Sequence, residues 1–227
     1  MLMIYPGSNG EELPEYITGL ESWSTTLYCL HFILWSDLQM SVLSISGISH
    51  TAEREPNDYY ATHPKAVEEL LKREKFNNNI WECACGEGNI SKVLKSHGYN
   101  VFSSDLIDRK YQDKIIDFLQ TDLEFNGDIV TNPPFKYTNE FILKSLESIP
   151  MGNKVALFLK LNYLSGKKRY KEIYSKFPPY RLYVFSGRVS CSKNNTPEGF
   201  KTNGMDYAWF IWEKGKLGPT EIKWIYN

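Results

Sequence analysis

The sequence predicts an α/β protein built around a mostly parallel β-sheet. From residue 57 to residue 150, short apolar runs typical of buried strands alternate with stretches whose apolar residues recur at helical spacing. The segments between successive runs are long enough to hold the helices that connect parallel strands. Hydrophobic residues make up 42% and charged residues 23% of the 227 residues, which is typical of a globular protein. These observations favour β-α-β units that share one sheet.

Composition excludes several classes of protein. No run approaches about 18 apolar residues, so we expect no membrane span. The four cysteines are too few and too scattered for a disulfide framework in a chain of this length. Cys83 and Cys85 have no second pair of ligands nearby, so no metal site is predicted. A secreted mini-protein, a transporter and a zinc-finger module are therefore excluded, and we expect a cytoplasmic protein.

Three helices are predicted in the alternating region. The first begins at Pro64 behind Thr62, which we expect to cap it. The second ends at Gly98, a typical stop signal, and the third ends before Pro150. Each carries an apolar stripe, formed in turn by Ala66, Val67, Leu70 and Leu71, by Ile90, Val93 and Leu94, and by Phe141, Ile142, Ser145, Leu146 and Ile149.

Seven strands are predicted, at residues 80–84, 99–106, 115–119, 128–131, 155–161, 181–186 and 206–212. A basic helix is expected over residues 167–177, and a polar loop over 187–204. The last strand is rich in aromatic residues, which we interpret as core packing. Residues 1–50 show no clear period and are expected to be an N-terminal extension of uncertain role, whereas residues 51–227 are expected to form a single domain.

The charge is unevenly distributed. The chain has 26 basic and 27 acidic residues, yet residues 160–193 contain nine basic residues and one acid. A local basic block in a nearly neutral protein favours a polyanionic partner, although a solvated helix face is the simpler alternative. The residues that we expect to contact nucleic acid are Lys160, Lys167, Lys168, Arg169, Lys171, Arg188 and Lys193.

The turn after the first main strand has features of a cofactor site. It reads Glu82-Cys83-Ala84-Cys85-Gly86-Glu87-Gly88, and its two glycines are expected to let a ligand approach the backbone. Asp105 ends the next strand, where an acid typically binds ribose hydroxyls. The position of a third glycine holds Ser91, and the carboxylates of Glu82 and Glu87 suit a cationic cofactor without phosphate better than NAD.

The ends of two later strands add further candidates. Asp117 and Phe118 could accept from an adenine amino group and pack on the ring, although a surface acid before a core phenylalanine is equally common. Asn132-Pro133-Pro134-Phe135 is the strongest signal in the chain. The two prolines fix the backbone, so that the Asn132 side-chain oxygen and the Pro133 carbonyl could accept hydrogens from an amino group beside the Phe135 ring.

With these motifs, residues from about 47 to 227 resemble the S-adenosylmethionine-dependent DNA adenine-N6 methyltransferases of phages and prophages, with the motif order of the gamma group. The resemblance implies a Rossmann-like class I methyltransferase fold, with a mostly parallel seven-stranded sheet and helices on both faces. It also implies S-adenosylmethionine as the cofactor and DNA as the partner, in a bacterial cytoplasm if the gene belongs to a phage.

The resemblance assigns roles to individual residues. Within the stretch 57–64, Thr62 would contact the methionine carboxylate of the cofactor. The first cofactor motif would comprise Glu82, Cys83, Ala84, Gly86 and Gly88. Asp105 would bind the ribose, Asp117 and Phe118 would bind the adenine, and Leu106 would also contact the cofactor. Asn132, Pro133, Pro134 and Phe135 would be catalytic.

Three alternatives remain open: methylation of ribosomal RNA on adenine or guanine, methylation of a protein glutamine amide, and a catalytically inactive nucleic-acid-binding subunit. The basic block favours nucleic acid over protein but does not separate DNA from RNA. We expect no separate target-recognition domain, so the loop at 187–204 and residues 160–180 would have to read the target. The oligomeric state is not predicted.

Overall fold

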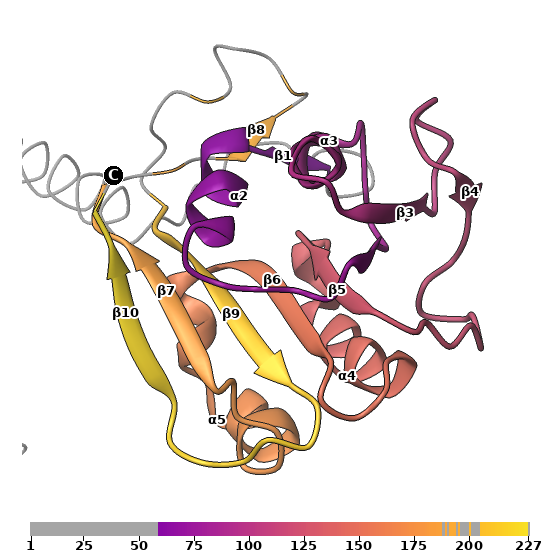
Figure 1. Ribbon diagram of the computed structural model, residues 1–227. Coiled ribbons are helices and arrows are strands. Elements are labelled where there is room, and N and C mark those ends of the chain that lie inside the picture. Colours follow the sequence, from indigo (N-terminus) through magenta and orange to yellow (C-terminus); the bar gives the residue numbers. More distant parts are fainter. Residues whose placement is uncertain are drawn as a thin grey trace, which may run out of the picture. The chain divides into compact units, whose positions relative to one another are not determined.

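The computed structural model describes residues 59–187, 189, 191–193, 195, 200 and 205–226. The predicted extension at residues 1–50 lies outside these residues. An eight-stranded sheet forms the centre, in the order β10-β7-β9-β6-β5-β2-β3-β4 (Figure 1). Its strands are β2 (Asn79–Glu82), β3 (Asn100–Asp105), β4 (Lys114–Ile115), β5 (Asp128–Thr131), β6 (Lys154–Lys160), β7 (Arg181–Phe185), β9 (Tyr207–Glu213) and β10 (Glu221–Ile225).

Most neighbouring strands of this sheet are parallel. β2 pairs in parallel with both β3 and β5, and β6 continues the parallel sheet beside β5. β9 is antiparallel to both of its neighbours, β6 and β7. A second, two-stranded antiparallel sheet joins β1 (Tyr60–Thr62) to β8 (Cys191–Lys193), with Thr62 opposite Cys191. The predicted α/β class with a mostly parallel sheet is confirmed.

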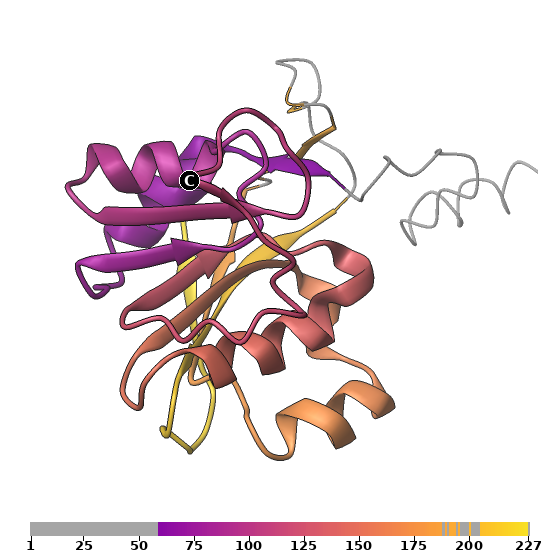
Figure 2. The same ribbon diagram turned by 90° about the vertical axis from the view of Figure 1, so that its right-hand side faces the viewer.

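Helices cover both faces of the large sheet, as predicted (Figure 2). α2 (Pro64–Leu71) and α3 (Asn89–Ser96) pack on one face with side chains such as Ile80, Val130 and Trp209. α4 (Thr138–Ser148) packs on the other face with Trp81, Ile129 and Phe210. The alternation Ile80–Trp81 shows how one buried strand supplies both cores, because successive side chains point to opposite faces. The aromatic residues of β9 are buried in these cores, which confirms their interpretation as core packing.

The remaining helical segments are short. They are the 3-10 turns η3 (Phe135–Tyr137) and η4 (Leu161–Leu164), the turn α5 (Lys167–Arg169) and the π-helical turn η5 (Tyr170–Tyr174). The basic helix that we expected at residues 167–177 is therefore shorter and partly π-helical.

Three sequence-based expectations are corrected. The sheet has eight strands rather than seven, because β10 adds a parallel edge strand beside β7. The strand expected at residues 115–119 is reduced to β4, since the Asp117 side chain accepts a hydrogen bond from the Leu119 amide and turns the chain. Thr62 does not cap α2: His63 occupies that position, and its Nδ1 accepts from the Lys65 amide at 3.1 Å.

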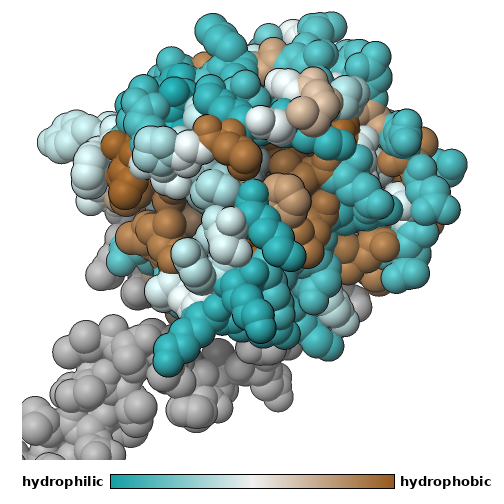
Figure 3. Space-filling view, turned by 90° about the horizontal axis from the view of Figure 1, so that it is seen from below, coloured by the Kyte–Doolittle hydropathy of each residue, from teal (hydrophilic) through white to brown (hydrophobic). Residues whose placement is uncertain are grey.

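The surface mixes polar and apolar side chains. Figure 3 shows one such face, where apolar residues lie among polar ones. Within the described residues, no helix is long and apolar enough to cross a membrane.

Candidate active site

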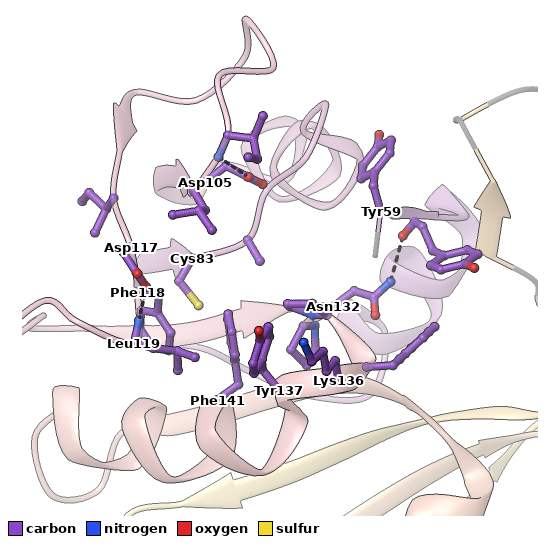
Figure 4. A pocket seen from close by; sticks show the side chains of 18 of the residues that line it. Tyr59, Cys83, Asp105, Asp117, Phe118, Leu119, Asn132, Lys136, Tyr137 and Phe141 are labelled. Carbon is purple, nitrogen blue, oxygen red and sulfur yellow. Dashed lines mark hydrogen bonds between the residues drawn. The ribbon is translucent and has the colours of Figure 1, made fainter. Parts of the chain in front are cut away.

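A cavity of about 700 Å³ lies at the carboxyl ends of β2, β3 and β5, within the size range of small-molecule sites. Asp117 and Phe118 lie on one side of it and Tyr59 on the other, with Asn132 and Phe141 between (Figure 4). Ten of the predicted site residues line it: Cys83, Ala84, Asp105, Leu106, Asp117, Phe118, Asn132, Pro133, Pro134 and Phe135. The ends of parallel strands thus bring together motifs that are far apart in the sequence.

Asp105 ties the first turn of the site to the second. One carboxylate oxygen accepts from the Gly86 amide at 2.7 Å, and the other accepts from the Ile107 amide at 3.0 Å. The residue is only 9% exposed, but it lines the cavity. A carboxylate has about four acceptor positions, so these two bonds leave capacity for the hydroxyls of a sugar.

Both the backbone conformation and the close packing of the first turn favour glycine at Gly86 and Gly88. Gly86 and Gly88 have φ values of +56° and +78°, which favour glycine. The space in front of them is filled by tyrosine rings, since an added Cβ would come within 2.3 Å of Tyr59 Cε2 and 2.0 Å of Tyr111 Cε1. Neither glycine is among the residues that line the cavity.

Glu82 is buried at the end of β2. It is 1% exposed, does not line the cavity, and accepts from the backbone amide of Ser91 at 2.7 Å and from the Ser91 hydroxyl. Burial raises the pKa of Glu82 to about 8, although the hydrogen bonds from Ser91 oppose this shift. Glu82 therefore fastens the first turn of α3 to the end of β2, and Ser91 stands where the sequence pattern would have a third glycine.

Asp117 and Phe118 both line the cavity but differ in their surroundings. Asp117 is exposed at the cavity edge. The Phe118 ring is 2% exposed and packs edge-on against Trp81, with ring centroids 5.1 Å apart, and against Phe141 at 5.0 Å. The packing of this pair is therefore that of an exposed acid followed by a core phenylalanine.

Asn132 has an unusual arrangement of its side-chain amide. The nitrogen Nδ2 donates to the Tyr60 carbonyl oxygen at 3.1 Å, to Thr62 Oγ1 at 3.0 Å and to Cys191 Sγ at 3.6 Å. The oxygen Oδ1 is buried and has no hydrogen-bond partner within the described part of the chain. Asn132 Oδ1 is therefore an acceptor that remains available to a ligand at the cavity wall. Thr62 is 2% exposed and is not among the residues that line the cavity.

The two prolines lead into a tight turn that places Phe135. The Pro134 carbonyl accepts from the Tyr137 amide at 3.0 Å, and the Tyr163 hydroxyl donates to the Phe135 carbonyl at 2.6 Å. The half-buried Phe135 ring has its centroid 5.5 Å from that of Tyr60, and Lys160 Nζ lies 4.3 Å from its centroid. These two hydrogen bonds hold the main chain around Phe135 in place just beyond the carboxyl end of β5.

Several cavity residues were not identified from the sequence. The most prominent is Arg109, whose guanidinium carbon lies 4.1 Å from the centroid of Tyr59 and whose buried Nε has no hydrogen-bond partner among the described residues. The signal for Arg109 was its place in the loop that follows Asp105. The others that line the cavity are Tyr59, Tyr60, Ile107, Ile116, Leu119, Gln120, Lys136, Tyr137 and Phe141. No group of three or more metal-ligating side chains is found among the described residues.

The predicted nucleic-acid contacts are only partly gathered. η4 continues directly from the carboxyl end of β6, so α5 begins near the edge of the sheet that holds the cavity, and Lys167, Lys168 and Lys171 are exposed there. The guanidinium of Arg169 donates to the carbonyls of Asn162, Tyr163 and Ser165. Arg188 and the side chain of Lys193 lie outside the described residues.

Comparison with solved structures shows the same fold in methyltransferases. A protein of Listeria monocytogenes, provisionally assigned as a class I S-adenosylmethionine-dependent methyltransferase, matches with a TM-score of 0.51 and 15% identity over 84% of this chain and 72% of its own. The modification subunit of a provisionally assigned type I restriction enzyme from Vibrio vulnificus matches with a TM-score of 0.52 and 12% identity over 85% of this chain and 50% of its own.

The M protein of the type I restriction enzyme EcoKI matches with a TM-score of 0.50 and 14% identity, over 72% of this chain and 45% of its own length. This chain thus spans half or less of the two modification proteins. No protein-family model and no curated protein matches the sequence. The described part of the chain therefore has the Rossmann-like fold of the class I S-adenosylmethionine-dependent methyltransferases.

Proposed function

We propose that this protein transfers a methyl group from S-adenosylmethionine to the N6 amine of adenine in DNA. The observation that carries the proposal is the buried Asn132 Oδ1, an acceptor without a partner in the described structure, on the wall of a cavity in a methyltransferase fold. A buried acceptor costs free energy unless a ligand satisfies it. An amine that becomes more positive as it reacts suits this acceptor better than a hydroxyl or a carbanion would.

The residues of the cavity fit an adenosyl cofactor. Asp105 offers acceptors for ribose hydroxyls, Asp117 offers one for an adenine amine, and Leu106 and Phe118 supply apolar surface. Asp105 and Asp117 place negative charge in the cavity, which favours a cationic ligand over a diphosphate. When bound, S-adenosylmethionine supplies an electrophilic methyl group on its sulfonium.

The protein's own contribution is positioning and electrostatics. The lone pair of adenine N6 is delocalised into the ring, so it becomes nucleophilic only as the nitrogen turns tetrahedral. Asn132 Oδ1 and the Pro133 carbonyl would accept the two hydrogens of the amine, and they would accept more strongly as positive charge develops. No nucleophile on the protein is required.

The Phe135 ring gives a flat surface for the target base. In duplex DNA the base has to leave the stack, which costs a few kcal/mol, and stacking on an aromatic ring returns about 1–3 kcal/mol. The exposed lysines of α5 and η5 would contact phosphates near the same edge of the sheet. The likeness of the fold to type I modification proteins, together with the gamma-like motif order, favours DNA.

A transfer assay with labelled S-adenosylmethionine tests the proposal. The acceptors are single-stranded DNA, duplex DNA from a methylation-free host, ribosomal RNA and a protein with accessible glutamine. We expect label in DNA, recovered as N6-methyladenine after nuclease digestion, and none with Asn132→Ala. Label in RNA or in glutamine alone would replace the proposed substrate, and no label in any acceptor would overturn the proposed function.

A further inference from the structure

We propose that the paired strands β1 and β8 hold the Asn132 amide in its reactive orientation, with Thr62 and Cys191 as positioning residues. The inference rests on the proposed function, because it concerns how the acceptor for the target amine is aimed. It gives Thr62 a role in orienting Asn132 in place of the cofactor contact that its motif suggested.

All three hydrogen-bond acceptors around Asn132 Nδ2 come from this two-stranded sheet. Tyr60 and Thr62 lie on β1, and Cys191 lies on β8 directly opposite Thr62. Thr62 and Cys191 are each 2% exposed, so neither side chain has bulk water as an alternative partner. Two segments separated by more than a hundred residues thus supply the hydrogen-bond acceptors for one amide group.

These acceptors matter because an asparagine amide has two nearly isosteric orientations. A half-turn about its terminal torsion exchanges the oxygen and the NH2 group. In the exchanged orientation, NH2 would face the cavity and repel the hydrogens of an incoming amine. Oδ1 would then face the Tyr60 carbonyl, which is an acceptor only and cannot pair with it.

The three contacts have different roles. The Tyr60 carbonyl determines which end of the amide faces the cavity. The Thr62 hydroxyl and the Cys191 thiol hold the amide plane in place, since both can accept from Nδ2 in the observed orientation. Burial raises the pKa of Cys191 to about 12, so the sulfur stays a neutral thiol and a weak acceptor. Thr62 is therefore the stronger of the two side-chain contacts.

The test compares turnover with cofactor affinity. Thr62→Val keeps the shape but removes the acceptor, and we expect kcat to fall about tenfold, the upper range for one neutral hydrogen bond. The dissociation constant of S-adenosylmethionine, measured by calorimetry, should stay at the parent value. Thr62→Ser should recover most of the turnover, and Cys191→Ala should lower kcat about twofold, as expected for a weak acceptor.

A matched control is available at the far edge of the sheet. The Thr220 hydroxyl donates to the Pro179 carbonyl at 2.7 Å, so Thr220→Val removes one threonine hydrogen bond away from the cavity and should leave kcat unchanged. If Thr62→Val does not fold, Cys191→Ala still tests the inference, because it removes one of the two side-chain acceptors and should lower kcat about twofold.

A readout that does not depend on activity separates the two proposals. The side-chain NH2 resonances of Asn132, assigned by their loss in Asn132→Ala, should shift in Thr62→Val but not in Thr220→Val. An active parent whose Thr62→Val variant keeps both kcat and these resonances would overturn the inference and leave the proposed function intact. Weaker cofactor binding at unchanged kcat would also overturn it, in favour of a cofactor contact. An inactive parent in which the resonances still shift would count against the proposed function alone.

Discussion

A carboxyl oxygen of Glu82 accepts a hydrogen bond from the Ser91 amide at 2.7 Å, nine residues along the chain and inside the core. This bond joins the end of β2 to the first turn of α3, next to the turn that carries Gly86 and Gly88. It also places an ionisable group where no water reaches it. Glu82 is therefore expected to contribute to the pH dependence of the stability of the fold.

Glu82→Gln should flatten the pH dependence of stability. The pKa of Glu82 is raised by burial from 4.5 to about 8, so between these values the folded chain keeps a proton that the unfolded chain has lost. The contribution of Glu82 to stability is then fully present below pH 4.5 and is lost as the pH rises toward 8. Glutamine can still accept from Ser91 but does not ionise. Urea unfolding between pH 5 and 8 should show a shallower decline for Glu82→Gln, whereas the exposed Glu124→Gln should follow the parent. Equal slopes in all three proteins would contradict the assignment.

The existence of the central strands was predictable from the sequence because each contains a local apolar run, whereas the edge strand β10 was missed and β4 is shorter than expected. Asp128–Thr131 is predicted with its observed bounds, since all four of its residues are buried. The contacts across the site were not predictable, because they join distant residues. Thr62 and Asn132 are 70 residues apart and meet only because the end of β1 lies against the turn that follows β5. The sequence places a glycine at position 86 of the turn, but it does not show that the Tyr59 ring occupies the space beside it.

Asp105→Asn should reduce the stabilisation that the cofactor confers. The carboxylate accepts from two backbone amides, and an amide group offers one oxygen in place of two. We expect a smaller rise in Tm on adding S-adenosylhomocysteine, through weaker binding to the folded state. Asp108→Asn, an exposed change three residues away, should keep the parent's rise. If Asp105→Asn keeps it too, the ribose does not bind at Asp105.

Arg109→Gln should weaken binding of the amino-acid end of the cofactor. Arg109 lines the cavity, stacks on Tyr59 and has a buried Nε without a partner in the described structure, whereas the Thr62 hydroxyl is taken up by Asn132. A guanidinium is well suited to a carboxylate. Calorimetry should show lower affinity for S-adenosylhomocysteine but little change for methylthioadenosine, which has no carboxylate. An equal loss for both ligands would place Arg109 against the adenosine instead.

Replacing Lys167, Lys168 and Lys171 together by alanine should weaken nucleic-acid binding about equally across sequences. These side chains are exposed, whereas Arg169 is held by carbonyls of its own turn and is left unchanged. The slope of log affinity against log salt should become shallower by up to about 0.9 for each phosphate of duplex DNA that the variant no longer neutralises. The same change at Lys72, Lys75 and Lys216, which are exposed at the other end of the parallel strands, is the charge-matched control. An unchanged slope in the variant at Lys167, Lys168 and Lys171 would show that these lysines form a solvated surface and do not contact phosphates.

Asn132 and Phe135 should fail in different ways when each is replaced by alanine. Asn132→Ala removes an acceptor that matters most as the amine becomes tetrahedral, so turnover should collapse while cofactor affinity barely changes. Nucleic-acid affinity should fall little, because phosphate contacts dominate it.

Phe135→Ala removes the surface on which the displaced base stacks, so it should weaken substrate binding as well as turnover. Its effect should be smaller on an unpaired adenine, where less unstacking is needed. Phe135→Tyr and Phe135→Trp should retain much of the activity, because any flat ring can stack. Steady-state kinetics on matched paired and unpaired targets provide the comparison. If Asn132→Ala turns over like the parent, the acceptor at the cavity wall plays no part in the reaction, and the methyltransferase assignment of this site fails with it.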